Sequence, residues 1–229
     1  MNKISIIFPV LNEVSEVETF KALIEKFDGH QIIFCDSGST DGTVEALAQL
    51  KSLYPNVLIC TKNIESPSVL KTIELSYSKI IHDHVLIHPI DLEIIPTLSS
   101  INISLLDEAV IFYKRYQPEN LLLKLQANFL NKVDLNIRHN FVWTNAPIIK
   151  TTILKSFKPD VYGFLEDVQL SDWLKKKVTI RIIENPITVS SRRYIKKGTV
   201  KRFAKNVFIM LMYRLKLLSI EKLKAIYYS

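Results

Sequence analysis

The sequence is poor in glycine and cysteine and holds no long apolar run. Its five glycines in 229 residues exclude collagen-like, fibrous and glycine-rich linker proteins. Its two cysteines cannot form the disulfide framework of a small secreted domain, so we expect two reduced thiols in a cytoplasmic protein. No stretch reaches the ~18 apolar residues of a membrane span, and the N-terminal apolar run lacks a signal-peptide cleavage site.

Charge is unevenly distributed along the chain. Residues 1–170 hold 15 basic and 20 acidic side chains, a net charge of −5, whereas residues 171–229 hold 15 and 3, a net charge of +12. A basic C-terminal quarter indicates an anionic partner such as a diphosphate or a phospholipid surface, or else an ordinary solvated face. Because no nucleic-acid-binding motif is present, we expect no nucleic acid among the partners.

The first half of the chain alternates short apolar runs with helical patterns. The predicted strands are residues 3–8, 31–35, 57–60 and 85–88, and the predicted helices are residues 14–27, 43–53 and 67–80. Continuous apolar runs are typical of strands buried on both faces, and this rhythm predicts βαβ units. We therefore predict an α/β fold with a mostly parallel central sheet flanked by helices.

The second half is more mixed. Predicted strands are residues 109–113, 178–183 and 187–189, the last two separated by Pro186. Predicted helices are residues 118–133, with Pro118 in the first turn, and 166–177, with acids first and lysines last. Residues 199–218 form a basic amphipathic pattern, followed by a short helix at 220–228. We expect one domain over residues 1–198, with the helices of 199–229 packed on it or on a membrane surface.

Two polar segments follow the first two predicted strands, where open parallel sheets bind ligands. They read PVLNE at residues 9–13 and DSGSTDGT at residues 36–43. Neither is a Rossmann G-x-G-x-x-G loop or a P-loop. Asp36 could accept hydrogen bonds from a ribose or a base; alternatively, the second segment is only a well-capped turn between a strand and a helix.

Together these two segments resemble the opening of family 2 glycosyltransferases of the GT-A fold. Residues 163–170 (GFLEDVQL), followed by Trp173 and Leu174, resemble that family's G-F-x-E-D-x-x-L segment. Residues 191–198 (SRRYIKKG) are similar to a stretch in a short bacterial subgroup found beside radical-SAM and selenodomain proteins. The resemblance implies an inverting transfer of a sugar from a nucleotide-diphosphate donor to an acceptor hydroxyl in glycan or glycolipid synthesis.

The resemblance also implies roles for individual residues. Asp167 would be the general base, held ionised at a helix start, and Glu166 would orient it or share its task. The expected donor-binding residues are Pro9, Asn12, Glu13, Asp36, Ser37, Asp41, Lys71, Arg192 and Arg193. The two arginines would bind the diphosphate or an anionic acceptor. Trp143 would line the acceptor pocket or, more simply, the edge of the core.

The metal site implied by the family departs from its usual D-x-D pattern. Here the matching stretch reads HPIDLE, residues 88–93. Asp91 is the first candidate ligand and Glu93 the second, for a hard divalent cation such as Mg²⁺ or Mn²⁺. The histidines at positions 82, 84 and 88 are expected to be ordinary sheet-end residues rather than ligands of a transition metal.

Two other functions compete with glycosyl transfer. A degenerate family member would bind a nucleotide sugar or a partner without catalysis, because its metal motif is incomplete. A nucleotidyltransferase on a related fold would need a lysine-containing, glycine-rich loop after the first strand, and PVLNE is not such a loop.

Overall fold

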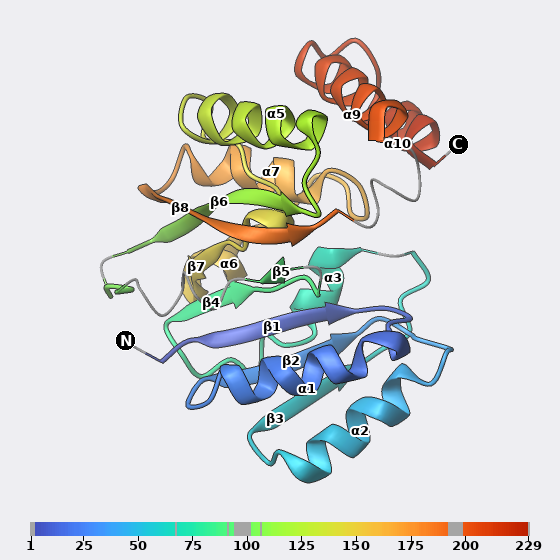
Figure 1. Cartoon of the computed structure of the whole chain (residues 1–229), viewed down its shortest axis with the longest axis vertical. Helices are drawn as coiled ribbons and strands as arrows, with labels where there is room; N and C mark the ends of the chain where they lie inside the picture. Colours follow the sequence, from blue (N-terminus) through green and yellow to red (C-terminus); the bar gives the residue numbers. More distant parts are fainter. Residues whose placement is uncertain are drawn as a thin grey trace.

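The computed structural model describes residues 3–66, 68–90, 92–93, 102–105, 107–191 and 199–228. Its centre is an eight-stranded sheet with the order β3-β2-β1-β4-β7-β6-β8-β5 (Figure 1). The strands are β1 (Ser5–Val10), β2 (Gln31–Asp36), β3 (Val57–Thr61), β4 (His84–Ile87), β5 (Leu92–Glu93), β6 (Ala109–Gln117), β7 (Ile148–Lys150) and β8 (Ile180–Ser190).

Helices cover both faces of this sheet. They are α1 (Val17–Lys26), α2 (Thr43–Leu53), α3 (Val69–Glu74), α5 (Leu121–Phe129), α6 (Thr151–Ser156), α7 (Glu166–Leu174), α9 (Thr199–Arg214) and α10 (Ile220–Tyr228), with short turns η1 (Val14–Glu16), η2 (Leu130–Leu135) and η3 (Trp143–Asn145). One core packs the strands against α1, α2 and α5, and the other packs them against α3, α6 and α7.

Strands β1 and β2 are apolar throughout because both of their faces are covered. Ile6 and Phe8 belong to one core and Ile7 to the other, as the two-residue period of a strand requires. Phe34 of β2 stacks on Phe8 with ring centroids 4.9 Å apart. These buried runs fix the register that brings Val10 beside Asp36 at the carboxyl ends of the two strands.

The sheet is mostly parallel, as predicted, with antiparallel pairs in its second half. Four of its seven pairings are parallel: β3 with β2, β2 with β1, β1 with β4, and β6 with β8. The short strand β7 enters antiparallel between β4 and β6, and β5 pairs antiparallel with β8. The α/β prediction is confirmed, and the sheet as a whole is mixed.

Several predicted boundaries were wrong: helix 67–80 is the shorter α3 (Val69–Glu74), and helix 199–218 ends at Arg214. Pro118 lies outside helix α5, because Asn120 caps the helix by accepting a hydrogen bond from the Leu123 amide at 2.9 Å. The lysines at 175–177 follow α7 instead of forming its last turn. Strand β8 continues through Pro186, because residues 184–186 stand opposite Tyr113 alone in an irregularity that needs no ladder hydrogen bond from the proline.

The C-terminal helices pack on the segment that leads into α7. Ile209 of α9 and Leu223 of α10 are buried against Phe164. Arg214 binds Asp172 of α7 through two hydrogen bonds, of 2.5 and 2.7 Å. Within the described part of the chain, every helix falls short of the length and apolar character needed to cross a bilayer.

Candidate active site

The loops that follow β1 and β2 are joined by hydrogen bonds between side chains and backbone. The Asn12 amide donates to Ser39 Oγ at 2.8 Å, and the Thr40 amide donates to Asn12 Oδ1 at 2.9 Å. Asn12 has a left-handed backbone, with φ of 55°, which asparagine adopts more readily than most residues. The Glu13 amide donates to Thr43 Oγ1 at 2.9 Å. The two segments singled out in the sequence therefore form one rigid platform.

Asp36 organises the second of these loops. Its side chain is buried, and Oδ1 accepts hydrogen bonds from the amides of Gly38 and Ser39 at 2.8 and 2.9 Å. Ser39 Oγ donates to its Oδ2. Neighbouring Ser37 is also buried, and its amide donates to the Val10 carbonyl at 3.2 Å. Any contact of Asp36 with a nucleoside is thus made by a carboxylate that already shapes the loop.

Gly38 allows the loop after β3 to approach closely. Its φ is +110°, and a Cβ built there would lie 2.9 Å from Asn63 Oδ1 and 3.1 Å from Asn63 Cα. A side chain at position 38 would therefore push the loop away. Close by, the Ile64 amide donates to the Ser37 carbonyl at 3.0 Å. The loops after β1, β2 and β3 consequently meet at one edge of the sheet.

Asp41 holds the start of α2. Its Oδ1 accepts from the Thr43 amide at 3.1 Å and from the Thr43 hydroxyl at 2.5 Å, and its Oδ2 accepts from the Val14 amide at 3.1 Å. The Thr43 hydroxyl is the main reason why the pKa of Asp41 lies below its usual value. The N-cap position itself is Gly42, and Asp41, one residue earlier, satisfies the amide of the first helical residue.

Glu166 connects α7 to the same edge. Its buried carboxylate accepts hydrogen bonds from the Ser68 hydroxyl, from the Leu70 amide at 3.2 Å and from the Gly163 amide at 2.7 Å. Ser68 is also the N-cap of α3, the helix that follows the β3 loop. Glu166 is therefore fully occupied in joining two helix starts, which suits the orienting role predicted for it.

Asp167 lies beside η3. Its Oδ2 accepts from the Trp143 amide at 3.3 Å and its Oδ1 from the Val168 amide at 2.9 Å. Burial raises the pKa of Asp167 to about 6 and outweighs these two amides, which favour the charged form. The sequence did not predict this rise, but a carboxyl group with a pKa of about 6 is still mostly ionised at neutral pH, as the resemblance implied. A carboxyl group with this pKa suits a general base working near neutral pH.

Lys114 of β6 is the charged neighbour that the sequence analysis missed. It is buried, and its Nζ donates to Thr144 Oγ1 of η3 at 3.1 Å. Burial lowers its pKa to about 8, while the carboxylates of Asp167 and Asp134 act in the opposite direction. A lysine directly after the apolar run AVIFY was the available signal. Trp143 itself is half-buried against the second core, as expected of a residue at a core edge.

The structure also describes Pro9 and Lys71, two further residues predicted to bind the nucleotide-sugar donor. Pro9 is half-buried in β1 opposite Cys35. Lys71 of α3 places its Nζ over the ring of Tyr162, 5.2 Å from the centroid, and Tyr162 donates to Glu74 Oε1 at 2.9 Å. Lys71 thus lies between the β3 loop and the segment before α7. Arg192 and Arg193 lie outside the described residues.

Only one of the two predicted metal ligands lies among the described residues. Asp91 lies outside the described residues, and Glu93 is exposed on β5. His88 points into the core, with its ring 4.9 Å from that of Phe8 and 5.5 Å from that of Phe27 between centroids. Within the described ranges, no group of three His, Cys, Asp or Glu side chains could hold an ion. Among the described residues, Glu93 and His88 do not by themselves make a metal site.

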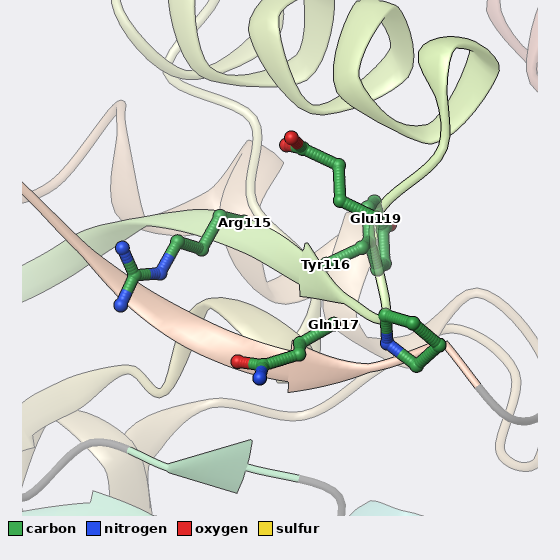
Figure 2. Close-up of a pocket in the computed structure, with 5 residues that line it drawn as sticks. Arg115, Tyr116, Gln117 and Glu119 are labelled. Atoms are coloured by element: carbon green, nitrogen blue, oxygen red, sulfur yellow. The ribbon is translucent and has the colours of Figure 1, made fainter.

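Two hollows lie near the carboxyl ends of β6 and β8. One, of about 530 Å³, is lined by Arg115, Tyr116, Gln117, Pro118 and Glu119 (Figure 2). The other, of about 280 Å³, contains Glu93, Glu16 and Gln117. Ser191 Oγ donates to the Pro118 carbonyl at 2.8 Å, so the first hollow adjoins the segment that continues to Arg192. Neither hollow was predicted: the first is lined by five consecutive residues at the end of β6, and the second combines residues from β5, β6, β8 and the start of α1.

Comparison with known proteins identifies this architecture. The model of the family described as Glycosyl transferase family 2 matches residues 5–67, which contain the loops after β1 and β2. No curated protein sequence matches the chain. Solved structures match it over most of its length at low sequence identity, and such a likeness shows the fold alone.

Three solved structures illustrate the likeness. S. aureus TarS in complex with UDP-GlcNAc has a TM-score of 0.58 at 15% identity, covering 82% of this chain and 58% of that one. The mannosyltransferase PcManGT of Pyrobaculum calidifontis, with GDP-Man and Mn²⁺, has 0.61 at 13% identity, covering 82% and 56%. Glucosyl-3-phosphoglycerate synthase of Mycobacterium tuberculosis, with Mn²⁺ and UDP, has 0.57 at 16% identity, covering 93% and 79%.

This chain spans 37% to 61% of the length of the TarS chains that it matches. The neighbours are GT-A glycosyltransferases crystallised with nucleotide sugars, nucleotides or Mn²⁺. The mixed sheet flanked by helices, the family match at its first two strand ends and these neighbours together show a chain with the GT-A fold.

Proposed function

We propose that this protein is an inverting glycosyltransferase that moves a sugar from a nucleotide-diphosphate donor to an acceptor hydroxyl in glycan or glycolipid synthesis. The observation that carries the proposal is the hydrogen-bonded connection from Ser68 to Glu166, which ties the start of α7 to the edge where the β1, β2 and β3 loops meet. A carboxyl group with a pKa of about 6, on Asp167, directly follows Glu166.

The donor would bind at the β1 and β2 loops. The family match over residues 5–67 supports contacts by Pro9, Asn12, Glu13, Asp36 and Ser37, and neighbours with this fold bind UDP-GlcNAc, UDP-Glc and GDP-Man. Lys71, Arg192 and Arg193 would supply positive charge for the diphosphate. Asp41 would shape this donor-binding site by fixing the start of α2.

Asp167 would act as the base. Its deprotonated carboxylate takes the proton of the acceptor hydroxyl while the hydroxyl oxygen bonds to the anomeric carbon. The bond from that carbon to the diphosphate oxygen breaks, and the diphosphate leaves with the electron pair. The buried ammonium of Lys114 stabilises the ionised form of Asp167, and Glu166 fixes the helix start that carries it.

A divalent cation, Mg²⁺ or Mn²⁺, held by Asp91 and Glu93, stays a prediction. Two of the neighbours described above were crystallised with Mn²⁺, which supports it. When bound, such an ion would offset the negative charge of the departing diphosphate.

We propose a cytoplasmic location for the protein. Its two free cysteines, Cys35 and Cys60, lie directly opposite each other on β2 and β3 and fit a reducing compartment.

A second candidate is a protein that binds a nucleotide sugar without transferring it. It is favoured by His88, which points into the core at the position where a metal motif begins. A thermal-shift screen of UDP-, GDP- and dTDP-sugars, with and without Mn²⁺, tests the binding that both candidates require, since a ligand of the folded state raises its stability. We expect at least one nucleotide sugar to raise the melting temperature; no shift with any of them would contradict both candidates.

A further inference from the structure

Exposed apolar side chains gather on two adjacent helices at one end of the molecule. We name as the α5–α9 surface the residues Leu121, Leu125, Phe129, Phe208, Leu211 and Leu215. They are 44% to 74% exposed. Helices α5 and α9 contact each other and lie together at the end farthest from α2 (Figure 1). The spacing of three or four residues places the side chains of each helix on one face, and Leu215 directly follows the last turn of α9.

This surface is not the packed side of either helix. On α9 the packed side carries Ile209 and Met212, which contact the Phe164 cluster. On α5 the packed side carries the buried residues Leu123 and Ala127. Each helix is therefore apolar on a second, outward face, where a helix on a soluble surface ordinarily presents polar residues. Large exposed apolar areas of this kind indicate an interaction site.

The charge around the surface selects the kind of partner. Residues 199–229 hold seven Lys or Arg side chains and one acidic side chain, while residues 1–170 carry a net charge of −5. Lys124 on α5 and Lys216 after α9 are exposed beside the apolar residues. Two copies of the chain meeting here would bring like charges face to face. An anionic lipid surface attracts this basic end of the chain.

We infer that the α5–α9 surface docks on anionic phospholipid membranes, with the leucine and phenylalanine side chains entering the headgroup region. The α9 helix alone, singled out by its sequence pattern, is half of this surface; α5 is the other half. Because α9 packs on the segment that leads into α7, docking sets the start of α7 close to the lipid headgroups. Membrane docking requires neither donor binding nor catalysis.

The test is co-sedimentation of the full chain with phosphatidylcholine vesicles, with and without phosphatidylglycerol, at low and high salt. We expect binding that requires phosphatidylglycerol and weakens with salt. The double variant Leu121→Gln/Leu125→Gln on α5 should weaken binding about ten-fold or more, and so should Leu211→Gln/Leu215→Gln at the C-terminal end of α9. Glutamine removes the apolar surface while it preserves charge and helix propensity.

The matched control is Leu53→Gln/Ile81→Gln. Both residues are as exposed as those of the α5–α9 surface, and Leu53 lies at the end of α2, at the opposite end of the molecule. This control should bind vesicles like the parent protein, and circular dichroism should show all variants folded. Equal binding by the α5 double variant and the parent would overturn the inference. So would a parent that ignores anionic vesicles at low salt, or one whose surface variants only abolish self-association.

Discussion

Glu166 and Ser68, 98 residues apart in the sequence, share a buried side-chain hydrogen bond that ties the start of α7 to the start of α3. Glu166→Gln keeps the shape but loses a charged acceptor for the Leu70 and Gly163 amides. We expect it to lower the free energy of unfolding by ~1–3 kcal/mol. Chemical denaturation checks this, with the exposed Glu65→Gln as control. Unchanged stability together with lost turnover would instead make Glu166 the base.

The raised pKa of Asp167 predicts that ionisation of this carboxyl group destabilises the folded protein. Between pH 3.8 and about 6 the folded state keeps a proton that the unfolded state releases. The free energy of unfolding therefore falls as pH rises through this range, and stays lower above it. Asp167→Asn removes this titration. We expect the variant to melt higher than the parent at pH 8, with a much smaller difference at pH 4. A difference of equal size at both values would contradict the assignment.

His88 should affect stability with the opposite pH dependence. Burial lowers its pKa to about 4, and neither ring nitrogen has a hydrogen-bond partner among the described residues. The free energy of unfolding is therefore highest above pH 6.5, the pKa of His88 in the unfolded chain, and it falls as the pH drops toward 4.

We expect His88→Leu to be more stable than the parent by ~1 kcal/mol at pH 8, because a buried polar group without a partner is removed. The gain should be larger at pH 5. Thermal melts at the two pH values measure it. A variant that is less stable at both would show that the ring makes a favourable interaction.

Asp36 should matter for both loop and ligand. In Asp36→Asn the Gly38 and Ser39 amides lose a charged acceptor. We expect nucleotide-sugar affinity to fall about ten-fold or more, with a loss of ~1–3 kcal/mol in unfolding free energy. Calorimetry on the folded variant decides the first point, with the exposed Asp28→Asn as control. Unchanged affinity would remove Asp36 from the donor site.

The sequence allowed the first half of the sheet to be predicted, because β1, β2 and β4 are apolar runs buried on both faces. It did not reveal the antiparallel entry of β7, since that three-residue strand is defined by partners far along the chain. The passage of β8 through Pro186 depends on the irregularity opposite Tyr113, which a single sequence does not display.

The candidate site, like the fold, could be predicted from the sequence only in part. Motifs placed Asp36, Asp41 and Asp167 correctly near strand ends or a helix start. The raised pKa of Asp167 could not be predicted, because it depends on how the folded chain buries its carboxyl group beside η3 and Lys114. The outward apolar face of α5 was not predicted either, because which of its leucines are buried depends on how the helix packs.

The most direct test of glycosyl transfer compares turnover and donor affinity on one preparation of Asp167→Asn, using a nucleotide sugar that stabilises the parent protein. Release of the nucleoside diphosphate measures turnover, and calorimetry measures affinity, with Asp28→Asn as the matched control. We predict that turnover falls by on the order of 10²–10⁴ while donor affinity is unchanged, because a base acts on the acceptor hydroxyl. Turnover retained in Asp167→Asn, or a parent protein that binds the donor and never releases nucleoside diphosphate, would contradict the account.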